Sequence, residues 1–129
     1  MVKEQVSHSR QIATVLGLAG IGVVHLLDLP GKFSEAPYVA YMYIGAIVAS
    51  VFLIERLLTR KRSIDYVATV ALSASVLIGF IINRTVGMPG ATGDIGNWLE
   101  PLGFLSLFVE TWTVWQAFSG YRALRALEN

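Results

Sequence analysis

Residues 11–29 read QIATVLGLAGIGVVHLLDL, an almost unbroken apolar run that is long enough to cross a bilayer as a helix. Three further apolar runs of similar length follow at 37–58, 64–84 and 98–121. Only 15% of the residues are charged, whereas soluble domains carry about a quarter. The sequence therefore predicts an all-α protein, a transmembrane antiparallel four-helix bundle that forms a single domain over residues 1–129.

The composition excludes several classes of function. A net charge of +1 leaves no basic surface with which to bind nucleic acid. The chain has no cysteine, so it forms no disulfide, iron–sulfur cluster or thiolate metal site. Apart from His25, no histidine is placed to activate a serine or threonine nucleophile in the apolar runs. The sequence therefore does not favour a membrane enzyme.

Lysine and arginine are distributed unevenly over the predicted connections. Of the 10 such residues, only Lys32 and Arg84 lie outside the N-terminal segment, the C-terminal segment and the region of the 59–63 connection. By the positive-inside rule, this predicts a multi-pass plasma-membrane protein with both termini in the cytoplasm. Connections 29–36 and 85–97 would then face outward. The second is rich in glycine, and we expect it to be a compact outer loop over the mouth of the bundle.

Turn and cap residues predict where the helices begin and end. The Pro-Gly pair at 30–31 predicts a turn after the first helix, and Pro37 suits the first turn of the second. Ser63 is expected to cap the third helix. The sequence NWLE that starts at Asn97 matches a capping box, with Asn97 as the cap and Glu100 at the third helical position.

Ionisable side chains at membrane depth are costly, so they mark candidate sites. His25 and Asp28 lie three residues apart near the outer end of the first run, and Arg84 ends the third run on the same side. Glu110 lies roughly 12 Å down the fourth helix from Leu102, at 1.5 Å per residue. The sequence predicts a polar cluster near the outer face, made of His25, Asp28, Asn83, Arg84, Glu100 and Glu110.

Two interpretations of this cluster remain open. In the first, Arg84 pairs with Asp28 or Glu110, His25 hydrogen-bonds to the other carboxylate, and the network only sets the helix register. In the second, the cluster binds an ion, a proton or a small polar ligand. His25, Asp28 and Glu110 are also weak candidates for a Zn²⁺ or Fe²⁺ site, because one imidazole and two carboxylates suit these ions. No other cofactor is predicted.

The small size of the chain favours an accessory or interaction subunit, either in a larger membrane complex or in a homo-oligomer. The alternative is an ion-, proton- or small-ligand-binding membrane protein that uses the outward-facing cluster. The expected partners are the lipid bilayer and either other membrane subunits or further copies of the chain.

The string NRTVGMPGATGDIGNWLEPLGFLSLFVE at residues 83–110 contains an Arg-Thr-x-Gly-x-Pro-Gly loop followed by Trp-Leu-Glu-Pro-Leu-Gly. It resembles a family of small, uncharacterised four-helix integral membrane proteins of actinobacterial type. The stretch from His25 to Asp28, before the Pro-Gly pair, is similar to that family as well. The resemblance implies that the protein lies in a bacterial plasma membrane. It draws attention to Arg84, Glu100 and Glu110 as candidate site residues, but it implies no activity for them.

Overall fold

Four helices make up almost the whole chain in the computed structural model, which describes residues 1–128. No β-strand occurs in this described part, so the all-α prediction is confirmed. The helices are α1 (Val2–Glu35), α2 (Pro37–Thr59), α3 (Ser63–Thr85) and α4 (Pro101–Glu128).

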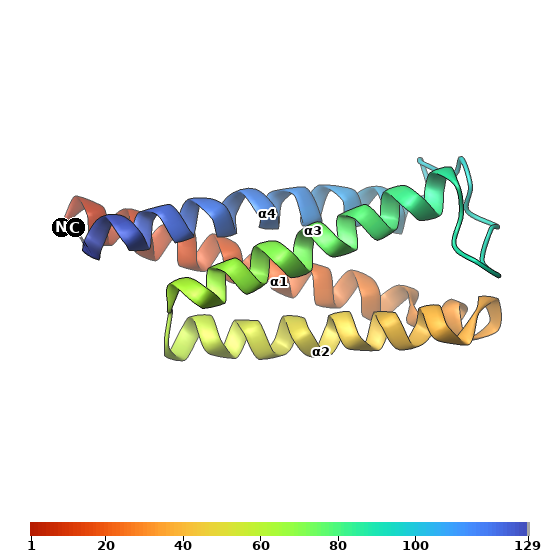
Figure 1. Ribbon diagram of the computed structural model, residues 1–129, viewed down its shortest axis with the longest axis horizontal. Helices are drawn as coiled ribbons and strands as arrows, with labels where there is room; N and C mark the ends of the chain where they lie inside the picture. Colours follow the sequence, from red (N-terminus) through yellow and green to blue (C-terminus); the bar gives the residue numbers. More distant parts are fainter. Residues whose placement is uncertain (129) are drawn as a thin grey trace.

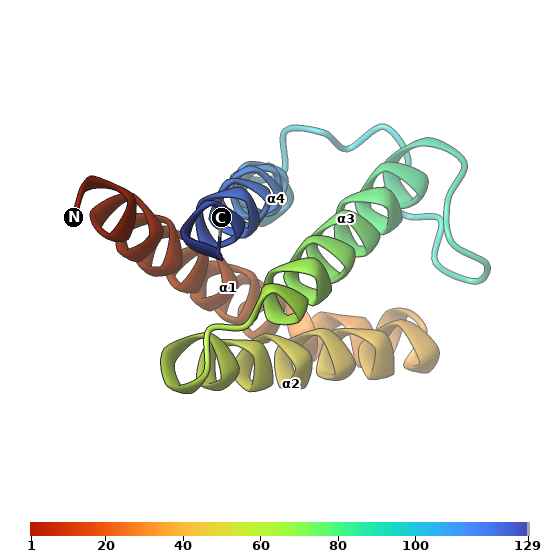
Figure 2. The same ribbon diagram turned by 60° about the vertical axis from the view of Figure 1, so that its left-hand side comes forward.

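The helices lie along a shared long axis, and the chain reverses direction at each connection (Figure 1). Both ends of the chain lie at one end of the molecule, and the loop between α3 and α4 lies at the other. Helix α1 packs extensively against α2 and α4, and α3 packs against α4. Helices α2 and α3 touch much less, because they diverge from their short connection toward the loop end (Figures 1 and 2).

Helix α1 is longer than expected at its C-terminal end. The predicted turn at 30–31 is wrong, because the helix continues through Pro30 and ends at Glu35. Proline removes one backbone hydrogen bond, but Lys32 pairs with carboxylates one turn away on either side, which stabilises this last segment. The chain then turns at Ala36, which is extended, and Pro37 is the first residue of α2 as predicted.

The connection between α2 and α3 is closed by ionic contacts. Ser63 is the first helical residue and not the cap, which is Arg62. The carboxylate of Asp65 accepts a hydrogen bond from the backbone N–H of Arg62 at 3.0 Å, and its other oxygen pairs with Arg56 at 3.0 Å. The acidic side chain in the first turn therefore replaces the hydroxyl cap expected from Ser63.

Helix α4 starts three residues later than predicted. The helix begins at Pro101, so the expected cap at Asn97 is wrong. The side chain of Glu100 takes that role, because its carboxylate accepts hydrogen bonds from the backbone N–H groups of Leu102 at 3.2 Å and Gly103 at 2.6 Å. The helix also runs beyond the predicted end, to Glu128.

Large apolar side chains cover much of the exposed surface of the bundle, and many of its buried side chains are polar, unlike in a soluble protein. Helices α1, α2 and α3 are each long and apolar enough to cross a membrane, which supports an integral membrane protein. Helix α4 does not meet that criterion, contrary to the expectation of four such runs. Its buried face carries polar residues, which lower its mean hydropathy, while its outer face exposes large aromatic residues. The buried polar residues of α4 are Ser106, Glu110, Thr113 and Gln116, and the exposed aromatic ones are Phe104, Phe108, Trp115 and Phe118.

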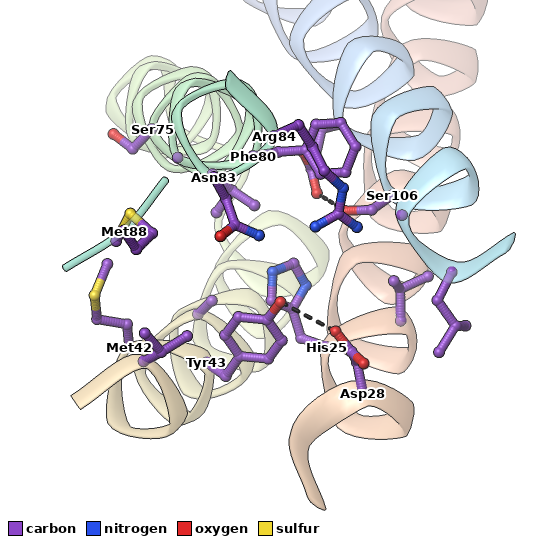
Figure 3. Close-up of a pocket in the computed structure, with 18 of the residues that line it drawn as sticks. His25, Asp28, Met42, Tyr43, Ser75, Phe80, Asn83, Arg84, Met88 and Ser106 are labelled. Carbon is purple, nitrogen blue, oxygen red and sulfur yellow. Dashed lines mark hydrogen bonds between the residues drawn. The ribbon is translucent and has the colours of Figure 1, made fainter. Parts of the chain in front are cut away.

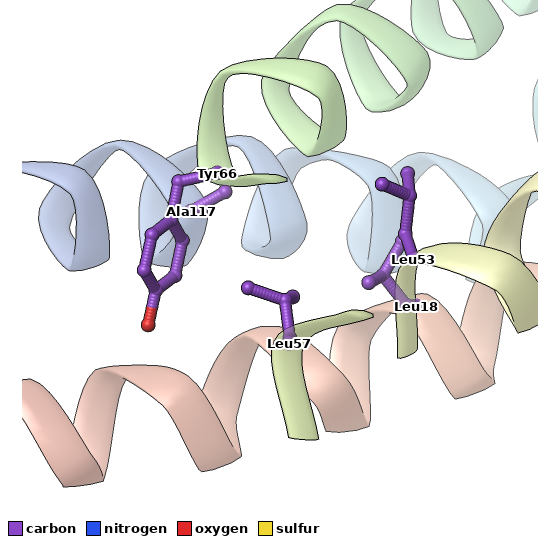
Figure 4. Packing of buried hydrophobic residues seen from close by; sticks show 5 residues of the cluster. All are labelled: Leu18, Leu53, Leu57, Tyr66 and Ala117. Carbon is purple, nitrogen blue, oxygen red and sulfur yellow. The ribbon is translucent and has the colours of Figure 1, made fainter. Parts of the chain in front are cut away.

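The apolar core lies in the half of the bundle near the α2–α3 connection. Leu18, Leu53, Leu57, Tyr66 and Ala117 form its buried centre, contributed by all four helices (Figure 4). These contacts hold α2 and α3 together at this end only. The opposite half contains most of the predicted polar cluster instead.

Close packing of α1 against α4 depends on Gly17. A Cβ atom there would collide with Thr113 and lie 3.1 Å from Cδ1 of Trp112, whereas a Cβ at Gly45 would meet nothing within 4 Å. We therefore expect Gly17→Leu to destabilise the protein by about 1–3 kcal/mol, the usual cost of overpacking. Gly45→Leu is the matched control and should keep the stability of the wild type. Thermal unfolding in detergent, followed by circular dichroism, measures both, and equal losses in the two variants would refute this packing.

Candidate functional site

A cavity of about 320 Å³ lies between the four helices, in the half of the bundle next to the loop (Figure 3). This volume is typical of a site for a small molecule. Of the predicted cluster, all members except Glu100 line the cavity. The polar and aromatic lining residues are His25, Asp28, Tyr43, Ser75, Phe80, Asn83, Arg84, Ser106 and Glu110.

His25 is oriented by its own helix and does not bond to a carboxylate, so the predicted partner is wrong. Its Nδ1 lies 2.8 Å from the carbonyl oxygen of Ile21. A carbonyl only accepts, so Nδ1 carries the proton and Nε2 is a lone-pair acceptor in the neutral ring. The imidazole also packs on Tyr43, with ring centroids 4.7 Å apart. Both rings face the same space in Figure 3.

Asp28 takes part in a network centred on Lys32, which the sequence did not single out as a site residue. The hydroxyl of Tyr43 donates to Asp28 at 3.1 Å, and the ammonium of Lys32 lies 3.5 Å from the same carboxylate. Lys32 is buried and also pairs with Glu35 at 3.2 Å and Asp94 at 3.5 Å. The four-residue spacing from Asp28 to Lys32 could have revealed this pair, but the turn expected at 30–31 concealed it.

Arg84 pairs with neither Asp28 nor Glu110, so both predicted partners are wrong. Its Nη1 lies 3.2 Å from Asp94 in the loop, and its Nη2 lies 3.5 Å from Glu100. The guanidinium also lies over the ring of Phe80, 4.7 Å from its centroid. Arg84 thus joins α3, the loop and the start of α4.

Gly103 allows this close approach of Arg84 to α4. A Cβ atom at Gly103 would collide with the guanidinium of Arg84 and would lie 3.0 Å from Oε2 of Glu100. Only glycine leaves room for the guanidinium beside the helix backbone at this point.

Among the acidic and basic residues of the predicted cluster apart from His25, only Glu110 has no charged partner in the described part of the chain. Its side chain is fully buried, at 0% exposure. Oε2 accepts a hydrogen bond from the hydroxyl of Ser106, while Oε1 has no partner among residues 1–128. A buried carboxyl oxygen with an open lone pair is costly unless something else in the cavity bonds to it.

The loop between α3 and α4 is bound to the end of the bundle that contains the cavity, and its Met88 lines the cavity. Asp94 bridges Arg84 and Lys32, and the backbone N–H of Gly96 donates to the carbonyl of Arg84 at 2.7 Å. Partial burial would by itself raise the pKa of Asp94, but the charges of Arg84 and Lys32 outweigh it and hold that pKa below its ordinary value. Asp94 is therefore ionised at neutral pH.

A second contact ties the loop to the start of α2. Ala91 is buried against Ala36 and Val39, and the hydroxyl of Tyr38 donates to the carbonyl of Pro89. The loop therefore spans from α3 to α2 across the end of the bundle opposite the two termini (Figure 1).

The cavity reaches the surface between α2 and α3. Met42 on α2 and Ser75 on α3 both line it, and both are exposed, Met42 to 54%. The lining near this opening is apolar and includes Ala46, Leu72 and Val76. The opening therefore lies on the side of the bundle, between the apolar core and the loop.

The described residues contain no group of three His, Asp or Glu side chains that could hold a metal ion. His25, Asp28 and Glu110 line one cavity, but Asp28 is engaged by Tyr43 and Lys32. The metal-ion alternative receives no support from this arrangement.

We expect Asp94→Asn to release the loop, because it removes the charge that bridges Arg84 and Lys32. Hydrogen exchange at neutral pH should become faster in residues 86–100 than in the wild type. Glu55→Gln is the matched control, since Glu55 is exposed near the C-terminal end of α2, away from the loop. Because the pKa of Asp94 is lowered, its contribution is present at neutral pH and is lost as the pH falls through that lowered pKa. Unchanged exchange in the Asp94 variant would contradict this role.

Comparison of the chain with protein-family models, with curated proteins and with solved structures found no match. What this chain does must therefore follow from the chemistry of its own residues. Among the side chains that line the cavity, Glu110 has a buried carboxyl oxygen with no hydrogen-bond partner in residues 1–128.

Proposed function

We propose that this chain is an integral membrane protein that binds a small, largely apolar ligand in the cavity between its helices. One observation carries the proposal: a cavity of about 320 Å³ contains the fully buried carboxyl of Glu110, and Oε1 of that group has no partner among the described residues. An ionisable group buried at membrane depth without a partner marks a functional site, because it is costly to retain for packing alone.

The ion pairs of Lys32 and Arg84 explain why charged residues gather next to the loop, but they do not explain the polar residues deeper in the cavity. The charges of Lys32 and Arg84 are each paired with carboxylates of α1, the loop and the start of α4. Glu110 and the acceptor nitrogen of His25 lie outside that network. This division favours ligand binding over a purely structural role for the polar cluster.

We further propose that all four helices cross a plasma membrane, with both termini in the cytoplasm and the loop outside. The aromatic outer face of α4 supports a fourth span, because its polar groups face the other helices and not the lipid. The excess of basic residues near the two termini supports this orientation.

The orientation can be tested with single cysteines, because the chain has none of its own. Thr92 in the loop and Ser9 near the N-terminus are both exposed. In intact bacterial cells that express each variant, we expect a membrane-impermeant maleimide to label Thr92→Cys at once, and Ser9→Cys only after lysis. The reverse pattern would show that the termini are outside, and equal labelling of both in intact cells would refute a single orientation.

An accessory or interaction subunit is a second proposal. The aromatic residues on the outer face of α4 support it, since Phe104, Phe108, Trp115 and Phe118 are all more than half exposed. Their spacing places them on one side of the helix. A partner helix could bury this face as readily as lipid does.

The cavity itself can be tested by labelling a cysteine within it. Ser106 is buried and lines the cavity, whereas Ser73 is buried and does not line it. We expect N-ethylmaleimide to modify Ser106→Cys in membranes and to leave Ser73→Cys unmodified under the same conditions.

Filling the cavity should abolish this labelling. Gly79 lines the cavity, and a Cβ atom there would meet nothing within 4 Å, so Gly79→Leu places its side chain in open space. We expect Gly79→Leu to protect the cysteine at 106, whereas Gly45→Leu, on the exposed side of α2, should not. If the cysteine at 106 stays unreactive in both backgrounds, the cavity does not admit a small molecule and the proposal fails.

A further inference from the structure

We infer that the ligand of this cavity is an amphipathic amine, in which an apolar body carries one ammonium group that binds at Glu110 and His25. This inference rests on the ligand-binding function proposed above and names its ligand class. It follows from the balance of charge around the cavity, from the hydrogen-bonding groups that remain open, and from the position of the opening.

The balance of charge at this end of the bundle is negative. Lys32 and Arg84 are the two cations, and four carboxylates already pair with them: Asp28, Glu35, Asp94 and Glu100. Glu110 adds a fifth carboxyl group, with no lysine or arginine paired to it within residues 1–128. A cationic ligand would offset this excess, whereas an anionic ligand would increase it.

The open hydrogen-bonding positions are acceptors at the points where a ligand head group would lie. Oε1 of Glu110 has no partner, and Nε2 of His25 is left as an acceptor because Nδ1 donates to a backbone carbonyl. An ammonium group carries only donors, so it can donate to either position. The rings of Tyr43 and Phe80 also line the cavity, and each already has a cation over it, Lys32 and Arg84 respectively.

One open donor competes with this assignment. Nε of Arg84 is buried without a partner, so it would attract an acceptor on a ligand. Its guanidinium is already opposed by Asp94 and Glu100 through the two terminal nitrogens. A carboxylate ligand is therefore the sharpest rival, and it belongs in the experiment.

The remainder of the cavity suits an apolar body. Val39, Met42, Ala46, Leu72 and Val76 line it between the polar groups and the opening. Methionine side chains adapt to different apolar shapes, and Met42 lies at the opening itself. Because the opening lies on the side of the bundle between α2 and α3, an amphipathic amine dissolved in the bilayer can reach the site with its ammonium end first.

The test compares three probes that share one apolar body: 4-phenylbutylamine, 4-phenylbutanol and 4-phenylbutyrate. Binding to the full chain in lipid nanodiscs is measured by calorimetry at neutral pH. We expect the amine to bind at least about tenfold more tightly than the alcohol, because a charge-assisted hydrogen bond replaces a neutral one. Glu110→Gln should abolish this preference. Glu55→Gln, the same change at an exposed position, should retain it.

The outcomes separate the ligand class from the ligand-binding function. If the wild type binds amine and alcohol equally, or binds the carboxylate most tightly, the inference that the ligand is an amine is wrong, while the proposed ligand-binding function stands. If no probe binds, that inference is also wrong, and labelling of the cysteine at 106 then decides whether the proposed ligand-binding function stands. The comparison of the three probes on the wild type decides whether the site prefers an amine, even if Glu110→Gln fails to fold. Loss of amine binding in Gly79→Leu but not in Gly45→Leu confirms that the cavity is the site.

Discussion

The constraint on which this structure depends is that polar side chains inside the bundle have few partners other than the protein itself. Helices with an apolar exterior have no water along their length, so a buried hydroxyl must find its partner within the protein. The buried hydroxyls of Ser7, Ser50, Tyr66 and Ser73 have no such partner among residues 1–128. Several threonines meet this need within their own helix, donating to the carbonyl four residues earlier, as Thr14, Thr69 and Thr113 do. Such side chains pack anywhere along a helix interface without a partner from another helix.

Charged side chains cannot be satisfied in this way, and the ion pairs of Lys32 and Arg84 lie together at the loop end. Arg84 is the link between the elements there, because it contacts the loop through Asp94 and the start of α4 through Glu100. The same carboxylate of Glu100 caps α4, so the pairing of Arg84 and the first turn of that helix are stabilised together. Gly103 makes this possible by leaving room for the guanidinium.

The cavity is a consequence of how α2 and α3 are held. At one end, Leu57 and Tyr66 belong to the apolar core that joins the two helices. At the other end, α3 reaches α2 only through the loop, where Ala91 packs on Val39. Between these two contacts the helices diverge, and the space they leave contains His25 and Glu110, which neither the core nor the ion-pair network uses, beside Asp28 and Arg84, which that network does use (Figures 1 and 3). Oε1 of Glu110 has no partner among residues 1–128.

The candidate site was only partly predictable from the chain. His25, Asp28, Asn83, Arg84 and Glu110 were identified correctly as neighbours, because their depth along apolar runs places them at one end of any bundle with short connections. Their individual partners were not predictable, and the roles of Lys32 and Tyr43 were missed. A partner depends on side-chain reach and rotation between helices, and neither is encoded in spacing along one helix.

The sequence by itself determined the number and approximate extent of the helices and predicted four membrane spans, of which α1, α2 and α3 are long and apolar enough. Those features follow from local hydrophobicity and helix length, which need no tertiary contact. Only the tertiary structure decided that α1 continues through Pro30, and that Arg84 binds the loop and leaves Glu110 without a charged partner. The first depends on pairing that offsets a locally unfavourable residue, and the second on contacts between separate elements, so these energies appear only when the helices are packed.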